Sequence, residues 1–162
     1  MAADVLFLTA FVTAIGCGLM AGLFFVFSVA VMPGFGRVAA AHGLPAMQAI
    51  NVAIINPIFL LVFLGTAVTS AGIIIASLLN WAEGAAYYVA GGLFYLVGVI
   101  LVTFVVNVPM NNAIAPLDAT APQSTVGWQD YLKRWTAWNH VRTIASILST
   151  IAVTLGLIAS AS

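Results

Sequence analysis

Four long apolar stretches, separated by polar connections, dominate the hydrophobic pattern of the chain. They cover residues 5–32, 57–79, 85–106 and 140–160. A helix of about 20 apolar residues spans the hydrocarbon core of a bilayer, and each stretch reaches that length. Apart from Arg142 near one end of the last stretch, none contains a charged residue. The pattern predicts an all-α fold, an integral membrane four-helix bundle that forms a single domain over residues 1–162.

Composition supports a lipid environment. The chain is 64% hydrophobic and only 5% charged, whereas soluble domains are about a quarter charged. Its formal net charge is zero, which excludes the basic face that nucleic-acid binding requires. The single cysteine, Cys17, excludes an intrachain disulfide and a multi-cysteine metal site, and no metal-ligand spacing occurs. The expected partner is the lipid bilayer.

The connections differ in length. Residues 80–84 form a tight hairpin, while residues 33–56 and 107–139 form long polar loops. We expect Pro33 to stop the first helix and the third helix to break or restart around Pro109, because proline lacks a backbone donor. With four spans, both long loops lie on one face of the membrane, and the termini and hairpin lie on the other.

Charge predicts the orientation. All four basic residues accompany the long loops, and the opposite face carries only Asp4 and Glu83. The positive-inside rule therefore places the long loops in the cytoplasm and both termini outside, with a bacterial inner membrane as the expected location. The basic residues are Arg37, Lys133, Arg134 and Arg142.

Aromatic and small residues suggest how the bundle meets lipid and packs. Aromatic residues cluster near both predicted interfaces, as in interfacial belts. They are Trp128, Tyr131, Trp135 and Trp138 on one side and Trp81, Tyr87 and Tyr88 on the other. Gly18 and Gly22, at four-residue spacing in the first span, and a seam of small residues in the second span predict close helix packing; the seam is formed by Gly65, Thr69, Gly72 and Ala76.

Polar residues gather on the side of the long loops. They are Ser28, Asn51, Asn56, Asn107, Asn111, Asn139, His140 and Arg142. One interpretation is a vestibule where the four helices open toward the loops. The other is ordinary, because asparagine caps helices and an arginine can extend to lipid phosphate.

The sharpest pattern opens the fourth span. At about 100° per residue, one helix face carries Trp135, Asn139, Arg142, Thr143 and Ser146, with His140 at its flank. His140 and Arg142 lie about 160° apart around an ideal helix. An imidazole there can act as a base and a guanidinium can hold an oxyanion. A histidine bonded to a loop carbonyl is the alternative.

Several strings together resemble a known family. They are Gly22–Ser28 with Val31–Pro33, Met47–Asn51 with Asn56–Pro57, Asn107–Asn111, and Trp135–Thr143. The chain resembles the anthrone oxygenase-like family of small four-span membrane proteins, many of them domains of unknown function. The last two strings are the most specific, and together the strings extend over nearly the whole chain.

The resemblance implies a membrane oxygenase that needs no cofactor and oxidises an apolar phenolic anthrone to an anthraquinone with dioxygen. His140 would be the base, and Arg142 and Asn139 would stabilise the enolate. Substrate-binding roles would fall to Asn107 and Asn111 for the phenolic oxygens, to Trp135, Trp138 and Phe27 for ring stacking, and to Asn51, Asn56 and Ser28 as further polar contacts.

Two other function classes remain. A noncatalytic accessory or scaffold subunit fits the same fold, because nothing in the chain demands turnover. A small multidrug exporter also uses four helices, but it needs a membrane-embedded carboxylate, and no span contains Asp or Glu. The sequence leaves the oligomeric state open.

Overall fold

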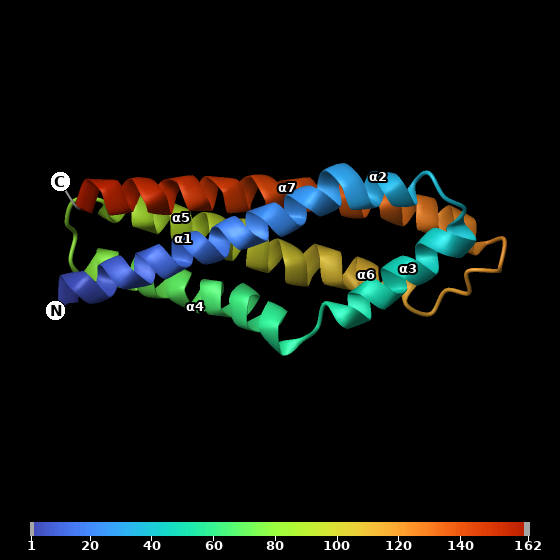
Figure 1. The fold of residues 1–162 in the computed structure, drawn as a ribbon, viewed down its shortest axis with the longest axis horizontal. Coiled ribbons are helices and arrows are strands. Elements are labelled where there is room, and N and C mark those ends of the chain that lie inside the picture. Colours follow the sequence, from blue (N-terminus) through green and yellow to red (C-terminus); the bar gives the residue numbers. More distant parts are fainter. Residues whose placement is uncertain (1, 161–162) are drawn as a thin grey trace.

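The computed structural model describes residues 2–160, and every regular element within them is helical (Figure 1). The α-helices are α1 Ala2–Val26, α2 Met32–Phe35, α3 Ala40–Ala53, α4 Pro57–Leu79, α5 Ala85–Tyr95, α6 Val108–Ile114 and α7 Ser124–Ser160. Three π-helical segments interrupt them: η1 Phe27–Val31, η2 Leu96–Leu101 and η3 Thr103–Asn107. The predicted all-α fold is confirmed.

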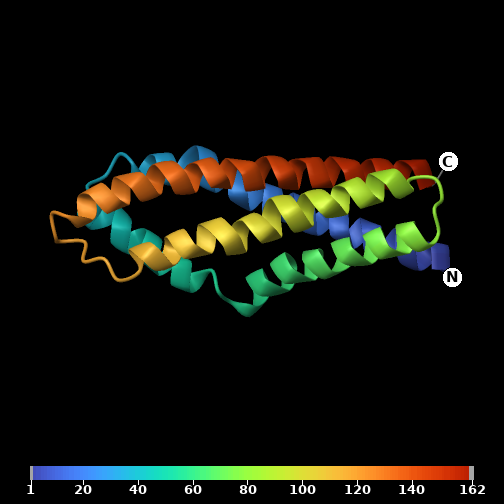
Figure 2. The ribbon, with the colours of Figure 1, turned by 180° about the vertical axis from the view of Figure 1, so that it is seen from behind.

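Four continuous helices are long and apolar enough to cross a membrane: Asp4–Phe35, Pro57–Leu79, Ala85–Ile114 and Ser124–Ser160. Their outer faces expose many large apolar side chains, including Leu61, Val68, Val105 and Ile144. Soluble monomers rarely expose contiguous apolar surface on this scale. The chain is therefore an integral membrane four-helix bundle. Its ends and the α4–α5 hairpin lie at one end of the bundle, and α3 lies at the other (Figures 1 and 2).

The two long connections are not the polar loops that we predicted. The first contains the helix α3, and the second is largely helical because α6 follows η3 and α7 begins at Ser124. The reason is a second apolar core, in which Leu44 and Met47 of α3 pack with Trp128, Tyr131 and Trp135 of α7. These buried residues recur at spacings of three and four, a helical signal that the surrounding polar residues obscure in a hydropathy profile.

Neither Pro33 nor Pro109 ends its span: the prediction is wrong for Pro33, and around Pro109 the third span restarts as α6 rather than breaking. Each proline is the second residue of a short α-helix that directly follows a π-helical segment, η1 for Pro33 and η3 for Pro109. Proline lacks the N–H that would continue an ordinary α-helical ladder. The wider π turn changes the hydrogen-bond register just before it, so the chain stays helical through both positions.

The aromatic-belt prediction is wrong for four residues. Trp128, Tyr131, Trp135 and Tyr88 are all buried, at no more than 5% exposure. Trp138, Trp81 and Tyr87 are exposed. In the second core, Trp128 stacks on Tyr131 with a centroid distance of 5.5 Å. The three buried rings of α7 therefore hold α7 to α2 and α3, and Tyr88 of α5 packs instead with Ile73 and Val153.

The close helix contacts also differ from prediction. Gly18, Gly22 and Gly65 have no neighbouring atom within 4 Å of an added Cβ. Tight contacts lie at other glycines instead: a Cβ on Gly16 of α1 would clash with the Thr66 side chain of α4, and a Cβ on Gly91 of α5 would be 2.6 Å from Val153 Cγ2 and 3.2 Å from the Ser149 carbonyl oxygen of α7. Spacing alone identifies small residues that permit close packing, but it does not show which helix face is buried.

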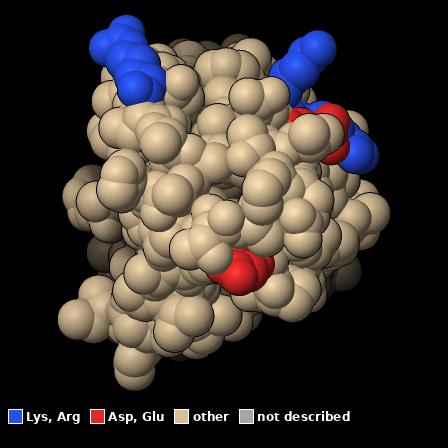
Figure 3. All heavy atoms as spheres, turned by 90° about the vertical axis from the view of Figure 1, so that its right-hand side faces the viewer, with Lys and Arg blue, Asp and Glu red and all other residues tan. Residues whose placement is uncertain are grey.

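Three of the four basic residues lie exposed at the α3 end of the bundle. They are Arg37, Lys133 and Arg134, and Arg134 pairs with Asp130 at 3.3 Å. Figure 3 views this end and shows the basic groups at its periphery. Arg142 is only 5% exposed and lies inside the bundle. The orientation argument therefore depends on three charges rather than four.

We expect these charges to keep the α3 end cytoplasmic. In a Cys17→Ala background, a membrane-impermeant maleimide should label Glu83→Cys in intact cells and Gln123→Cys only after lysis, because the two exposed positions lie at opposite ends of the bundle. The reverse labelling pattern would show that the predicted orientation is inverted.

The α5–α7 contact predicts a difference between two glycines. Gly91→Ala should lower the free energy of unfolding by about 1–3 kcal/mol, because the methyl group meets the backbone of α7. Gly18→Ala, whose added methyl group meets nothing within 4 Å, should be neutral or stabilising by about 0.5–1 kcal/mol. Thermal unfolding in one detergent compares them, and equal losses would remove the close-packing explanation.

Candidate functional site

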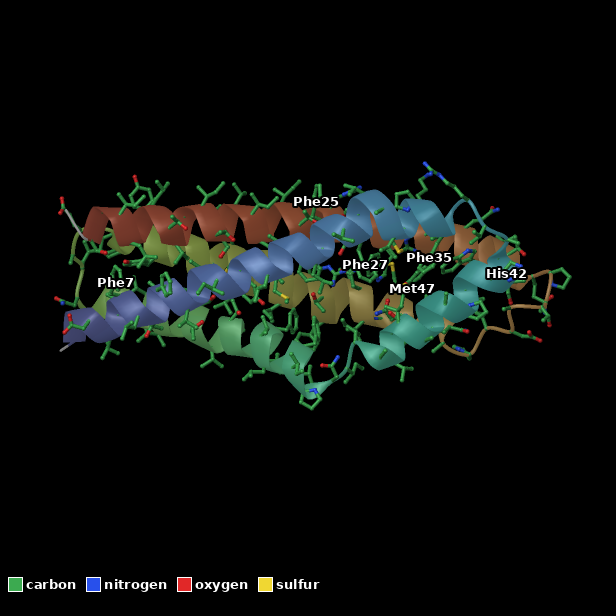
Figure 4. The ribbon with its side chains drawn as sticks, viewed as in Figure 1. Phe7, Phe25, Phe27, Phe35, His42 and Met47 are labelled. Carbon is green, nitrogen blue, oxygen red and sulfur yellow. The ribbon has the colours of Figure 1, made fainter. Side chains whose placement is uncertain are left out.

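A cavity of about 900 Å³ lies between the end of α1, the helices α3, α4 and α6, the segment η3, and α7. Most of its wall is apolar. Figure 4 shows two of the lining residues, Phe27 and Met47, in the region where α1, α3 and α7 come together. The polar or aromatic side chains at the wall include Gln48, Asn51, Thr103, Asn107, Asn111, Trp135 and Arg142.

The rim of the cavity is apolar and faces outward. Val52 and Ile55 near the α3–α4 connection line the cavity and are 76% and 70% exposed. Leu64 of α4 and Phe104 of η3 also line it and are exposed. A hydrophobic rim of this kind favours contact with acyl chains over water. The cavity therefore opens through a side of the bundle that suits lipid.

Arg142 is the one charged side chain among the lining residues. Its Nη2 donates to Asn139 Oδ1 at 2.7 Å, and its Nη1 donates to Thr103 Oγ1 at 3.2 Å. The guanidinium carbon lies 4.4 Å from the Phe24 ring centroid and 5.0 Å from that of Trp135. The Nε–H group is buried without a partner. The guanidinium is thus held in a fixed position with its Nε–H group unused.

No carboxylate in residues 2–160 forms an ion pair with this guanidinium. The four acidic residues are Asp4 and Glu83 near the opposite end, Asp118 in the α6–α7 loop, and Asp130, which pairs with Arg134. Burying an ion without a counter-charge costs several kcal/mol. Hydrogen bonds and ring faces offset part of that cost. The wall still carries a positive charge that an anionic ligand would complement.

Asn139 holds Arg142 in position from the side of α1, outside the cavity. Its Nδ2 donates to the Phe24 carbonyl oxygen at 2.7 Å and to Ser28 Oγ at 2.8 Å, while its Oδ1 accepts from Arg142. Ser28 Oγ also lies 3.2 Å from Thr143 Oγ1. Asn139 and Ser28 are buried and do not line the cavity. They are positioning residues, which fix the arginine against α1.

In the third span, a stripe of residues at four-residue spacing faces the interior of the bundle. The stripe consists of Tyr95, Val99, Thr103, Asn107 and Asn111. In an ordinary α-helix of 3.6 residues per turn, each step of four residues drifts by about 40°, so this stripe would leave the interior. The π-helical segments η2 and η3 contain more residues per turn. They keep Thr103 and Asn107 on one face, beside the cavity.

The two asparagines of this stripe differ. Asn111 Oδ1 accepts from Trp135 Nε1 at 2.8 Å and from Tyr131 Oη at 2.9 Å, so it fixes both rings of α7. Asn107 is only 1% exposed, and both its Nδ2 and its Oδ1 are buried without a partner. Buried polar atoms are usually hydrogen-bonded. The Asn107 amide is therefore a candidate ligand contact.

A family model described as anthrone oxygenase matches residues 54–152. The chain belongs to the anthrone oxygenase family. No curated protein and no solved structure matches it. The region that matches the anthrone oxygenase model contains α4 through α6 and most of α7. It therefore includes Thr103, Asn107, Asn111, Trp135 and Arg142, which form one side of the cavity.

The structure brings six of the eleven predicted site residues to the cavity wall. Those at the wall are Phe27, Asn51, Asn107, Asn111, Trp135 and Arg142, and Ser28 and Asn139 lie behind it. The prediction missed Thr103, which holds Arg142, and Phe24, whose ring and carbonyl contact Arg142 and Asn139. Thr103 lies four residues before the predicted site residue Asn107, and this helical spacing could have identified it as a residue on the same helix face.

Three predicted residues lie elsewhere. Asn56 caps α4 by accepting from the Phe59 N–H at 3.0 Å, and Trp138 is 40% exposed. His140 is exposed and lines a separate shallow hollow with Met32 and Lys133. His140 and Arg142 lie about 160° apart around α7. Because Arg142 faces the interior of the bundle, His140 faces outward. In the part of the chain that the structure describes, no three His, Cys, Asp or Glu side chains cluster as metal ligands would.

The two fully buried asparagines should respond in opposite ways to leucine. Asn139→Leu should destabilise the protein by about 3–5 kcal/mol, because it removes one of the two hydrogen-bond partners of a buried cation. Asn107→Leu removes an amide without partners and should be neutral or stabilising by about 1 kcal/mol. Thermal unfolding of the ligand-free protein in detergent measures both. A large loss in Asn107→Leu would mean that this amide has structural partners.

Proposed function

We propose that the protein is an oxygenase that converts an apolar phenolic anthrone to the corresponding anthraquinone with dioxygen. The observation that carries this proposal is the buried Arg142 guanidinium, which forms no ion pair with any carboxylate of residues 2–160 and lies at the wall of an apolar cavity. Family membership supports the reaction class. The cavity chemistry supports a flat aromatic substrate that becomes an anion.

The cavity suits such a substrate in size and surface. Its volume of about 900 Å³ lies within the usual range of about 300–1,000 Å³ for small-molecule sites. The rings of Phe24, Phe27 and Trp135 supply faces and edges against which a fused ring system packs. The exposed apolar rim gives such a molecule a route from the bilayer.

Arg142 favours the reactive form of the substrate. An anthrone that loses a proton from its central methylene becomes a delocalised anion with most charge on the carbonyl oxygen. A fixed guanidinium stabilises that charge more strongly than it stabilises the neutral ketone, so it lowers the free energy of ionisation. The restraints from Asn139 and Thr103 mean that little reorganisation is needed when the charge forms.

The anion supplies the electrons that reduce dioxygen. The central carbon forms a bond to one oxygen atom, and after protonation the product is a hydroperoxide. The second methylene proton is then lost, the O–O bond breaks and water leaves. One anthrone and one dioxygen thus give one anthraquinone and one water. The methylene carbon loses four electrons, and the two oxygen atoms gain them.

The first proton has to leave without an acidic or imidazole side chain at the wall. Among the described lining residues none is Asp, Glu or His. The acceptor that we propose is a water molecule bound inside the cavity beside polar wall residues such as Gln48 and Asn51, and Arg142 raises the acidity of the substrate. His140, on the outer surface of α7, takes no part in this scheme.

Substitution of Arg142 tests the proposal. Protein in nanodiscs would receive a hydroxylated anthrone, with oxygen uptake and anthraquinone absorbance recorded together. Arg142→Gln should lower kcat/KM by about 10²–10³-fold, the usual loss when a donor to a developing oxyanion is removed. Arg142→Lys should keep part of the activity, because it retains the charge but not the planar donors.

His140→Ala is the matched control on the same helix and should stay within about threefold of wild type, because its side chain lies outside the cavity. Empty nanodiscs correct for spontaneous oxidation, and thermal unfolding shows that each variant is folded. Equal rates for Arg142→Gln and wild type would overturn the role of the guanidinium. A wild-type rate no higher than that of empty nanodiscs would favour the accessory-subunit alternative.

A further inference from the structure

We infer that an anionic phospholipid binds on the outer surface of α7, with its phosphate between Lys133 and His140 and its acyl chains along the apolar surface that follows. The starting observation is a hollow of about 400 Å³ between α2 and α7, which both side chains line and at which both are exposed. Met32 and Pro33 of α2 form its opposite wall. This site lies outside the cavity and does not depend on the oxygenase proposal.

One face of α7 changes from polar to apolar along its length. Because α7 is a single α-helix from Ser124 to Ser160, residues at successive spacings of three and four share a face. On the face that borders the hollow, the polar residues are Gln129, Lys133, Thr136 and His140, and the residues that continue the same spacing are Ile144, Ile147 and Ile151. The three isoleucines are exposed. A phospholipid carries the same order of groups, a charged headgroup followed by acyl chains.

The depth of the two basic side chains matches the headgroup layer. His140 begins the apolar stretch 140–160, and Lys133 lies two turns further out, at about 10 Å along the helix axis. The headgroup layer is about 5–8 Å thick on each side of the hydrocarbon core. A lysine side chain is long enough to extend back toward this layer. A phosphate between the two positions can therefore contact both.

The charge of the hollow is complementary to a phosphate. Lys133 supplies a positive charge with three N–H donors, and an imidazole supplies at least one N–H donor. Among the described residues that line the hollow, none is Asp or Glu. The neighbouring Asp130 pairs with Arg134 at 3.3 Å. A zwitterionic headgroup brings its own cation, which competes with the lysine for the phosphate, so the hollow favours a lipid with net negative charge.

The first span supplies apolar surface on the other side of the hollow. It packs along α7, with Ser28 Oγ 3.2 Å from Thr143 Oγ1. Phe25 and Val29, three residues before and one residue after this serine, are exposed, and Phe25 projects outward from the bundle (Figure 4). Acyl chains that extend from the hollow into the bilayer would therefore meet apolar side chains of both helices.

A comparison of two lipids tests the inference. Protein in detergent would be titrated with phosphatidylglycerol or with phosphatidylcholine of the same chain length, and native mass spectrometry would give Kd for the first lipid retained. Wild type should bind phosphatidylglycerol about fivefold more tightly, the factor that one lysine contributes toward an anionic lipid. In Lys133→Gln this ratio should fall below about twofold.

Arg134→Gln is the matched control, because it removes the same charge one position away. Arg134 lies about 100° around α7 from Lys133 and pairs with Asp130. At an ionic strength of about 0.15 M, exposed charges more than about 8 Å apart are largely screened, so Arg134→Gln should keep a ratio within about twofold of wild type. Equal losses in the two variants would show only a general attraction to the basic end of the bundle and would overturn the site.

A soluble headgroup distinguishes a lipid site from a site for free phosphate. Glycerol 3-phosphate in molar excess should not displace phosphatidylglycerol, because it lacks the acyl chains that contact the bundle. Displacement, or a wild-type ratio near one, would contradict the inference. Lys133 is exposed, so Lys133→Gln should unfold at the same temperature as wild type in lipid-free detergent. That result excludes loss of the fold as the cause of weaker lipid binding.

Discussion

The buried Arg142 guanidinium is the interaction on which the arrangement of the cavity depends. A charge inside a bundle of apolar helices must be held by neutral donors and acceptors when no acid is beside it. Asn139, Thr103 and the rings of Phe24 and Trp135 meet that need, and they come from α1, η3 and α7. The requirement to hold one cation therefore joins three segments at the cavity.

The π-helical segments make this arrangement compatible with continuous membrane helices. η1 lies in the first span, at the level of Phe27 and Ser28, and η3 brings Thr103 and Asn107 to the cavity. Both segments are followed by a proline that sits in a helix without ending it. π turns occur often at functional sites, and here they set the register of the side chains that surround Arg142.

Hydropathy predicts the four spans well, because the bilayer imposes a simple length and composition on each. It misses α3 and the first turns of α7, whose buried residues are diluted by polar ones. The 100° periodicity correctly joins Trp135, Asn139 and Arg142 on one face of α7. It cannot tell whether His140 or Arg142 faces inward, because periodicity fixes angles within a helix and only packing against other helices fixes its rotation. For the same reason, the sequence cannot show that Asn107 lacks a partner.

The outward-facing rim formed by Val52, Ile55, Leu64 and Phe104 has a consequence for how affinity is expressed. A ligand that enters through this rim equilibrates with the acyl chains and not directly with the aqueous phase. Apolar aromatic compounds partition strongly into hydrocarbon, and dioxygen, which is also apolar, does the same. The occupancy of the cavity is then governed by the mole fraction of the ligand in the bilayer. Apparent Kd and KM values, expressed as total concentrations, therefore scale with the ratio of lipid to water in the sample.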